Sequence, residues 1–180
     1  QPHISAGRIP TDKAYRFFVN KILKEEKATR VSSQLSRILN QERDIFNLTT
    51  RLSKFLAQRS LSLAAIHLLE DDFFYKEGWG EILEKPESKE DDFTSEFVNL
   101  IRMFEKNIRK IKTKRKIKIY IGEENPFTKA KNFSIIITKC SFPNNKKGVI
   151  SLLGPKRMQY QNNISLINSI LKTLDKNNYE

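Results

Sequence analysis

The fold is decided near the end of the chain, by the stretch Gly148-Val-Ile-Ser-Leu-Leu-Gly-Pro-Lys-Arg-Met-Gln-Tyr160 and the residues that follow it. Val149 to Leu153 is an apolar run that begins with β-branched residues, which is typical of a strand buried on both faces. Gly154 and Pro155 end this strand, because proline lacks an amide N–H and glycine permits a sharp turn. Apolar residues then recur at the three- and four-residue steps of one helix face: Ile164, Ile167, Ile170, Leu171 and Leu174. The sequence therefore predicts a strand, a turn and a helix that folds back.

Other apolar segments surround this unit. Leu61 to Leu69 and Phe133 to Phe142 are strand candidates, and Lys116 to Gly122 alternates polar with apolar residues. Pro143-Asn144-Asn145 joins the second candidate to the strand above, which indicates a hairpin. Phe93 to Lys112 has the spacing of an amphipathic helix, and Glu81 to Glu84 predicts a short one. Four strands interleaved with helices favour an α+β fold with an antiparallel-rich sheet.

A long helix is predicted ahead of the sheet, because residues Val31 to Arg59 contain neither glycine nor proline. Its apolar residues fall at heptad-like positions: Ile38, Ile45, Leu48, Leu52 and Phe55. Such a seam is able to pair two chains as a short coiled coil. The alternative is that the helix lies on the sheet of its own chain, since barely three repeats are present.

The charge is one-sided: 33 lysines and arginines face 21 acidic residues, for a net charge of +12. This favours a polyanionic partner such as DNA or RNA, although a soluble protein of lysine-rich composition fits the charge equally well. The single cysteine, Cys140, excludes an internal disulfide and fits a reducing cytoplasm. No apolar run approaches the roughly 20 residues that a membrane helix needs, so no membrane partner is expected.

One segment is recognisable. Pro2-His-Ile-Ser-Ala-Gly-Arg-Ile-Pro-Thr-Asp-Lys-Ala-Tyr-Arg-Phe-Phe-Val19 resembles the segment that closes the winged-helix head of the heat-inducible transcription repressors, the HrcA family. Ile4 and Ala14 stand where the family pattern has threonine and glycine. Three later segments resemble family segments in the family's order: Phe74 to Glu87, Ile121-Gly-Glu-Glu-Asn125, and Gly148 to Tyr160.

This resemblance implies a reduced GAF-like sheet packed by helices, preceded by a long helix and the tail end of a winged-helix domain. We expect residues 1–19 to end the winged-helix domain and residues 20–59 to form linking helices, including a possible dimer helix. Residues 60–176 would form the GAF-like regulatory domain. The chain begins at Gln1 without a helix-turn-helix and is short between Arg59 and Phe73. It is therefore expected to be a fragment or shortened relative that lacks most of the head and much of the central region.

The resemblance also implies a function. Family members are cytoplasmic repressors of heat-shock (chaperone) genes that bind an inverted-repeat DNA operator as homodimers, with activity tuned by the GroE chaperonin. The candidate DNA-binding residues are Gly7 and Arg8, at or beside a wing, with Lys13 and Arg16. A role for Arg8 and Arg16 in docking the head to the body fits equally well. The alternative function is a GAF-like small-molecule sensor without DNA-binding activity of its own.

The remaining reactive residues argue against an enzyme. His3 and His67 have no ligand-spaced neighbours, and Cys140 lies in an apolar strand with no histidine nearby in sequence. No phosphate-binding glycine loop or nucleophile elbow is present, so neither a cofactor nor a metal is expected. The basic run from Arg109 to Lys118 fits either a phosphate-contacting patch or a solvated turn. Arg157 is expected to brace the body against Glu123 or Glu124.

Overall fold

The computed structural model describes residues 10–25, 33–111, 117–128 and 130–177. Its centre is a five-stranded sheet in the order β2-β1-β5-β4-β3, in which every neighbouring pair is antiparallel. The strands are β1 (Leu63–Leu68), β2 (Phe73–Glu77), β3 (Lys118–Ile121), β4 (Phe133–Ser141) and β5 (Lys147–Pro155). The predicted hairpin is confirmed: Phe133 lies opposite Pro155, and Ser141 lies opposite Lys147.

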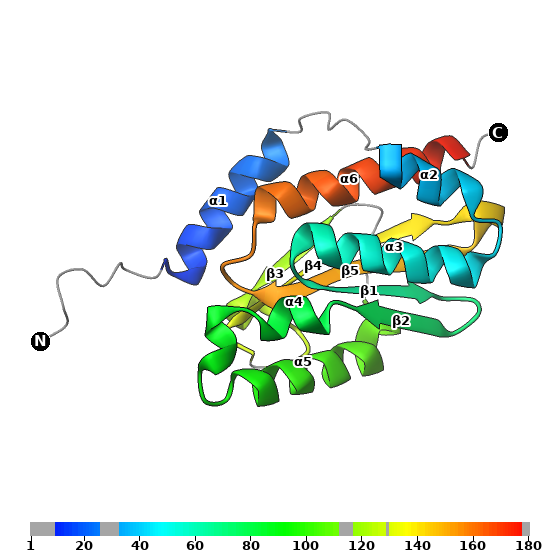
Figure 1. The fold of residues 1–180 in the computed structure, drawn as a ribbon. Coiled ribbons are helices and arrows are strands. Elements are labelled where there is room, and N and C mark those ends of the chain that lie inside the picture. Colours follow the sequence, from blue (N-terminus) through cyan, green and yellow to red (C-terminus); the bar gives the residue numbers. More distant parts are fainter. Residues whose placement is uncertain (1–9, 26–32, 112–116, 129, 178–180) are drawn as a thin grey trace, which may run out of the picture.

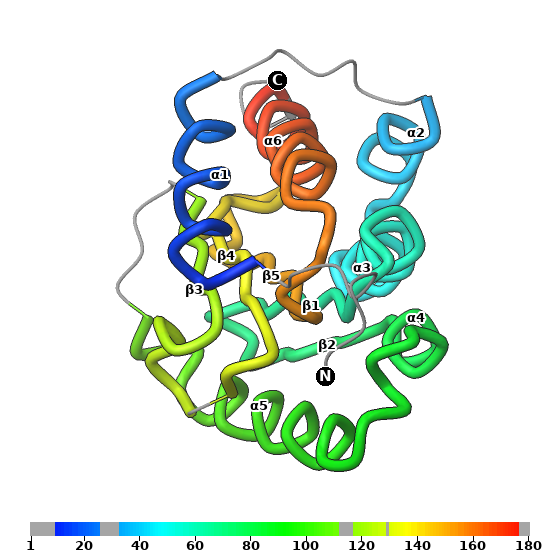
Figure 2. The backbone as a smooth tube through the Cα atoms, turned by 90° about the vertical axis from the view of Figure 1, so that its left-hand side faces the viewer, coloured from blue at the N-terminus to red at the C-terminus, as the bar shows by residue number. Residues whose placement is uncertain are grey.

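Helices cover both faces of the sheet (Figure 1). They are α1 (Asp12–Lys24), α2 (Ser33–Gln41), α3 (Ile45–Ser60), α4 (Trp79–Leu83), α5 (Phe93–Asn107) and α6 (Tyr160–Asn177). Figure 2 shows α6 above the sheet, between α1 on one side and α2 with α3 on the other, while α5 lies below. Short 3₁₀ turns follow α4, α5, β3 and β4: Pro86–Lys89, Ile108–Lys110, Gly122–Glu124 and Pro143–Asn145.

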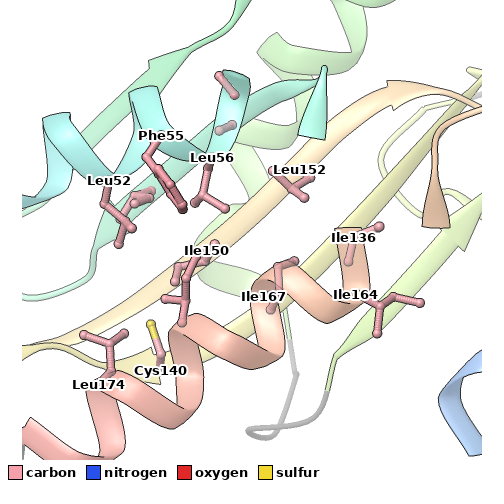
Figure 3. Close-up of a cluster of buried hydrophobic side chains, with 14 of the residues drawn as sticks. Leu52, Phe55, Leu56, Ile136, Cys140, Ile150, Leu152, Ile164, Ile167 and Leu174 are labelled. Atoms are coloured by element: carbon pink, nitrogen blue, oxygen red, sulfur yellow. The ribbon is translucent and has the colours of Figure 1, made fainter. Parts of the chain in front are cut away.

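Strand β5 divides the core, as its apolar run predicts. Ile150 and Leu152 belong to the cluster formed with α3 and α6, which Figure 3 shows in close-up. Val149 and Leu153 belong to the cluster formed with α5 on the other face. All four side chains are fully buried, and burying each stabilises the fold by about 1.5–3 kcal/mol. The strand that was expected to be buried on both faces is therefore confirmed.

The predicted continuous helix over residues 31–59 is wrong. The described part of this segment forms two helices, α2 and α3, separated by residues 42–44. Asp44 causes the new start, because its side chain accepts a hydrogen bond from the Asn47 N–H at 2.7 Å and caps α3. The first N–H groups of a helix have no carbonyl partner within it, and the Asp44 side chain supplies one. The absence of glycine and proline from the segment therefore did not show that a new helix starts here.

The five residues of the candidate dimer seam lie in the interior of their own chain. Four are buried, with exposures between 0% and 6%, and the fifth is half-buried against the same cluster: Ile38, Leu48, Leu52 and Phe55, then Ile45. Side chains already packed in a core are not available to a second chain without opening that core. The packing that the structure shows is therefore the alternative, in which these helices lie on their own sheet.

Two further differences concern boundaries. Strand β2 was not predicted, because Phe73–Glu77 has no alternation and its three aromatic residues are followed at once by two charged ones. Helix α1 runs without interruption across the predicted boundary between residues 19 and 20. Helices α2 and α3, from the predicted linking segment, share one core with the sheet.

Candidate functional site

Helix α1 begins at a capped end and docks by one face. The Thr11 hydroxyl accepts a hydrogen bond from the Ala14 N–H at 3.3 Å, as an N-cap threonine does. Val19 is buried, and Tyr15 and Ile22 pack against the core at the helical spacing of that face. The opposite face carries exposed residues, including Phe17, which is 77% exposed. The start of α1 lies beside strand β3 at one side of the sheet (Figure 2).

Asp12 joins α1 to two turns of the body. Its Oδ1 accepts from the Lys156 Nζ at 2.7 Å, and its Oδ2 accepts from the Glu123 N–H at 3.2 Å. Gly122 makes this approach possible, because a Cβ at that position would lie 2.1 Å from Asp12 Oδ2. Gly122 also has a φ of 53°, in the left-handed region that favours glycine. The carboxylate thus sits where only a glycine backbone leaves room for it.

Arg16, one turn further along α1, holds the end of strand β3. Its Nε donates to Glu124 Oε1 at 2.9 Å, and its Nη2 donates to the Ile119 carbonyl at 2.7 Å and also pairs with Glu124 Oε2. Glu124 Oε2 in turn accepts from the Ile121 N–H at 3.0 Å. Together, the guanidinium and the carboxylate bond two backbone groups of the last strand in the sheet. Charge-assisted bonds of this kind are about twice as strong as neutral ones.

Tyr160, the first residue of α6, supplies the buried side of this contact. Its ring centroid lies 5.9 Å from that of Tyr15. Its hydroxyl donates to the Lys156 carbonyl at 2.9 Å and lies 2.7 Å from Ser134 Oγ. Because a phenol has one proton, the Ser134 hydroxyl is the donor in the second bond. Burial raises the pKa of Tyr160 above its ordinary value, and the hydrogen bond from Ser134 lowers it by less.

We call this set of contacts the α1 junction, made by Asp12, Arg16, Glu124, Lys156 and Tyr160. Its members come from three stretches of sequence that lie more than 100 residues apart at the extremes. Those stretches are the ones singled out above by their resemblance: Pro2 to Val19, Ile121 to Asn125, and Gly148 to Tyr160. Three of the four segments that carry the resemblance therefore meet at one place.

The candidate DNA-binding residues differ in whether they are described and in how exposed they are. Gly7 and Arg8 lie outside the described residues. Lys13 is exposed on α1. The Arg16 side chain is 28% exposed and bonded to the body. The junction partners Asp12, Glu124 and Lys156 were not predicted, although all three fall inside the recognisable segments.

The basic run and Arg157 have other partners than expected. Arg157 Nη1 lies 3.9 Å from Glu87 Oε1, whereas Glu123 pairs with Lys131 and Glu124 with Arg16, so the expected pairing is wrong. In the basic run, Arg109 pairs with Asp72. Lys118 lies over the ring of Tyr120, 5.6 Å from its centroid. Residues 112–116 of the run lie outside the described residues.

His67 and Cys140 are both buried. His67 Nε2 lies 3.3 Å from Asp72 Oδ1. Arg109 and then His67 hold the pKa of Asp72 below its ordinary value through hydrogen bonds. Within the described ranges, no three histidine, cysteine or acidic residues gather in a way that would hold a metal ion.

Hollows lie on the surface on either side of the Pro126-Phe127 corner. One, of about 500 Å³, is lined by residues that include Glu123, Asn125 and Lys131. The other, of about 450 Å³, is lined by residues that include Met103 and Tyr120. A third hollow, of about 530 Å³, lies between exposed Phe18 and the start of α6. All three are open depressions, since the space between sheet and helices is filled by the two apolar clusters.

The sequence model of one family, described as the HrcA protein C terminal domain, matches residues 10–164. This chain belongs to the HrcA family. It is 38% identical over 99 residues to a heat-inducible transcription repressor HrcA of Clostridium botulinum (strain Eklund 17B / Type B), a match that covers 55% of this chain and 29% of that protein. The HrcA repressor of Ruminiclostridium cellulolyticum is 28% identical over 172 residues, which cover 79% of this chain and 49% of that protein.

A third relative gives the widest of these three matches. The HrcA repressor of Thermoanaerobacter pseudethanolicus is 28% identical, over 91% of this chain and 48% of that protein. The chain thus spans between 29% and 49% of the length of these three relatives. A crystal structure of a hypothetical protein superposes with a TM-score of 0.71 and 16% identity, over 99% of this chain and 81% of that chain. The predicted α+β, GAF-like fold is confirmed. Every helix in the described ranges is too short or too polar to traverse a bilayer.

Proposed function

We propose that this HrcA-family chain is the regulatory body of a cytoplasmic transcription repressor that silences heat-shock (chaperone) genes. The observation that carries the proposal is the α1 junction. The family-like segment that would close a DNA-binding head continues directly into α1, and α1 is bonded to the body through Asp12 and Arg16. A head that precedes α1 would therefore be oriented by these contacts.

In this proposal, the DNA operator is an inverted repeat and the protein binds it as a homodimer. A two-fold operator is matched by a two-fold protein, with the half-site spacing set by how each head is held. Phosphate contacts would come from the wing residues Gly7 and Arg8 and from exposed Lys13. Arg16 would act by positioning α1. The GroE chaperonin would tune activity by favouring the folded, dimeric form, and no catalysis is involved.

The first test removes the gene from its host. Transcripts of the chaperone genes are measured at the normal growth temperature in the deletion strain and after complementation. We expect deletion to raise these transcripts, the unaltered gene to restore repression, and the double variant Asp12→Asn/Arg16→Ala to restore it only in part. Unchanged transcripts after deletion would contradict the proposed function.

The second test asks whether the 180-residue chain binds DNA specifically by itself or only positions a DNA-binding domain. A band-shift assay compares the 180-residue chain on a duplex that carries the operator and on a scrambled duplex. Because phosphate contacts alone carry no sequence information, the chain should bind both duplexes weakly and equally, with a strong dependence on salt. Tight, operator-specific binding by these 180 residues would show that this part of the proposal is wrong.

A second candidate function is a small-molecule sensor. Asn125 is 8% exposed and lines the hollow of about 500 Å³, and its Nδ2 has no hydrogen-bond partner among the described residues. Unpaired buried donors are costly, and a ligand oxygen would satisfy this one. A ligand that binds only the folded state raises the melting temperature. A metabolite screen by thermal shift, repeated on Asn125→Ala, would support a sensor only if the shift disappears in the variant.

A further inference from the structure

The two edge strands of the sheet differ in whether other parts of the chain bond their outer backbone groups. At the β3 edge, Arg16 and Glu124 bond the Ile119 carbonyl and the Ile121 N–H. At the β2 edge, β1 is the only strand of the described residues that pairs with β2, while α3 packs against it through Phe46. No side chain or loop of the described residues bonds the backbone of Phe73–Glu77 from outside that pair. An uncovered edge presents unpaired N–H and C=O groups that are a template for another strand.

The side chains around this edge are apolar and partly exposed. Phe46 of α3 is 42% exposed, and its ring packs edge-on against Phe73 at a centroid distance of 4.8 Å. Phe73 in turn stacks with Tyr75 at 6.5 Å and 9°. On the other face of β2, Lys76 lies over the ring of Phe74 at 5.7 Å. Each face of the edge strand thus carries aromatic surface that is only half covered.

We propose that β2 pairs with β2 of a second copy of this chain, antiparallel and centred on Tyr75. In that register Tyr75 lies opposite itself, Phe74 lies opposite Lys76, and Phe73 lies opposite Glu77. No like charges meet, because each charged residue faces an aromatic one. The Lys76–Phe74 pair repeats between the copies a contact that already exists within each. The five residues of β2 are therefore complementary to an antiparallel copy of themselves, as a two-fold interface requires.

The occupant is a second copy rather than an unlimited series of copies. A strand added at β2 leaves each copy with its β3 edge, and that edge is closed by α1 through Arg16 and Glu124. Pairing therefore stops at two chains, which form one continuous sheet with a two-fold axis. This inference rests on the proposed function only in that a two-fold operator calls for a dimer. It replaces the heptad seam, whose residues are committed to the core.

The decisive experiment is a cysteine scan of the edge. Residues directly opposite in an antiparallel pair have Cβ atoms about 4.5–5.5 Å apart. A disulfide spans about 3.5–4.5 Å between Cβ atoms, so opposite cysteines on an edge strand need only a small local shift to bond. Under mild oxidation Tyr75→Cys should give a covalent dimer on a non-reducing gel. The controls are Lys118→Cys, on the closed edge, and the unaltered chain with its buried Cys140. Both should run as monomers on the non-reducing gel. Absence of the Tyr75→Cys dimer, or equal cross-linking of Lys118→Cys, would overturn the inference.

A second measurement does not depend on oxidation. Tyr75→Lys places two ammonium groups opposite each other, whereas Tyr75→Phe keeps the ring. Sedimentation of the 180-residue chain should show a dimer for the unaltered chain and for Tyr75→Phe. For Tyr75→Lys, the dissociation constant of the dimer should rise by at least about tenfold. Equal far-ultraviolet circular dichroism spectra would show that all three fold alike. A chain that is monomeric at every concentration, or a dimer that is indifferent to Tyr75→Lys, would disprove the interface.

These results are separable from those that test the function. A dimer that uses another surface would remove the inference and leave the repressor proposal standing. Cross-linking of Tyr75→Cys together with unchanged chaperone transcripts after gene deletion would support the interface and remove the repressor proposal.

Discussion

The two edges of the sheet show how one chain closes one side and leaves the other open. Strand β3 is short and ends in the Gly122–Glu124 turn, whose carboxylate folds back onto the strand and meets Arg16 from α1. Strand β2 is one residue longer, but its backbone pairs only with β1 among the described residues. Unpaired edges invite association, so a chain that covers only one edge limits where association occurs.

The comparison also links two properties that are usually separate. Arg16, which helps to close the β3 edge, is also one of the side chains that hold α1 in place, beside Asp12 and the apolar face of the helix. Any change that releases α1 therefore exposes a strand edge, and any partner that competes for that edge releases α1. For a repressor with a DNA-binding head ahead of α1, loss of the head's orientation and onset of association would be a single event.

The largest effect is expected where α1 approaches most closely. In Gly122→Ala, a Cβ would meet Asp12 Oδ2 at 2.1 Å, on a backbone with φ of 53°. The strain of that backbone region and the overlap together should lower the free energy of unfolding by about 3 kcal/mol. Urea denaturation followed by circular dichroism measures this loss.

Gly80→Ala is the matched control for that experiment. Gly80 lies in α4, and a Cβ there would meet nothing within 4 Å. Alanine is the better helix former, so this variant should be neutral or more stable by up to about 1 kcal/mol. Equal losses in both variants would mean that the fit between Asp12 and Gly122 does not stabilise the junction.

A smaller effect is expected from Arg16→Ala, which opens the β3 edge without a steric conflict. The variant loses its bonds to Glu124 and to the Ile119 carbonyl. Because both side chains are partly exposed, at 28% and 37%, we expect a loss of about 1–2 kcal/mol. If the closed edge limits association, light scattering should also show species larger than a dimer.

Lys13→Ala tests whether that loss is specific to docking. Lys13 is exposed on the same helix, and its removal should leave both stability and oligomeric size unchanged. An Arg16→Ala variant that behaves like Lys13→Ala would show that α1 is held by its apolar face alone.

The core of the fold was predictable because its signals are local. The apolar run of β5 and the periodicity of α6 each lie within a short window, and both predictions are confirmed. Gly154 and Pro155, predicted to end the strand after Leu153, are instead its last two residues. Strand β2 was missed because an edge strand needs no alternation when both of its faces are half-covered. The break before α3 was missed because Asp44 acts through its side chain.

The junction was only half predictable, for a different reason. Arg16 was singled out as a cation near a recognisable segment, but its partners Glu124 and Ile119 lie 108 and 103 residues away. Nothing local distinguishes a cation that meets phosphate from one that meets a distant carboxylate. The heptad seam failed in the same way, because apolar spacing indicates that a helix face is buried but not against which partner.

The smallest effect is expected at the turn before the open edge, where Asp72 bonds Arg109 and His67. Arg109, and to a lesser degree His67, keep the pKa of Asp72 below its ordinary value of 3.8 in the folded chain. A carboxyl with a lowered folded-state pKa contributes stability above its unfolded pKa and loses it as the pH falls through the folded pKa. The free energy of unfolding should therefore decline as the pH is lowered through 3.8 and below.

Asp72→Asn should remove this part of the acid dependence, and asparagine tolerates the positive φ of 50° at this position. The difference between the two melting curves should be slight, because the Asp72 side chain is 72% exposed and water screens its bonds. An acid dependence that is the same in both proteins would show that Asp72 does not hold the β1–β2 turn. The open edge would then be positioned by the aromatic contacts of β2 and by the ion pairs Asp71–Lys146 and Lys76–Glu105.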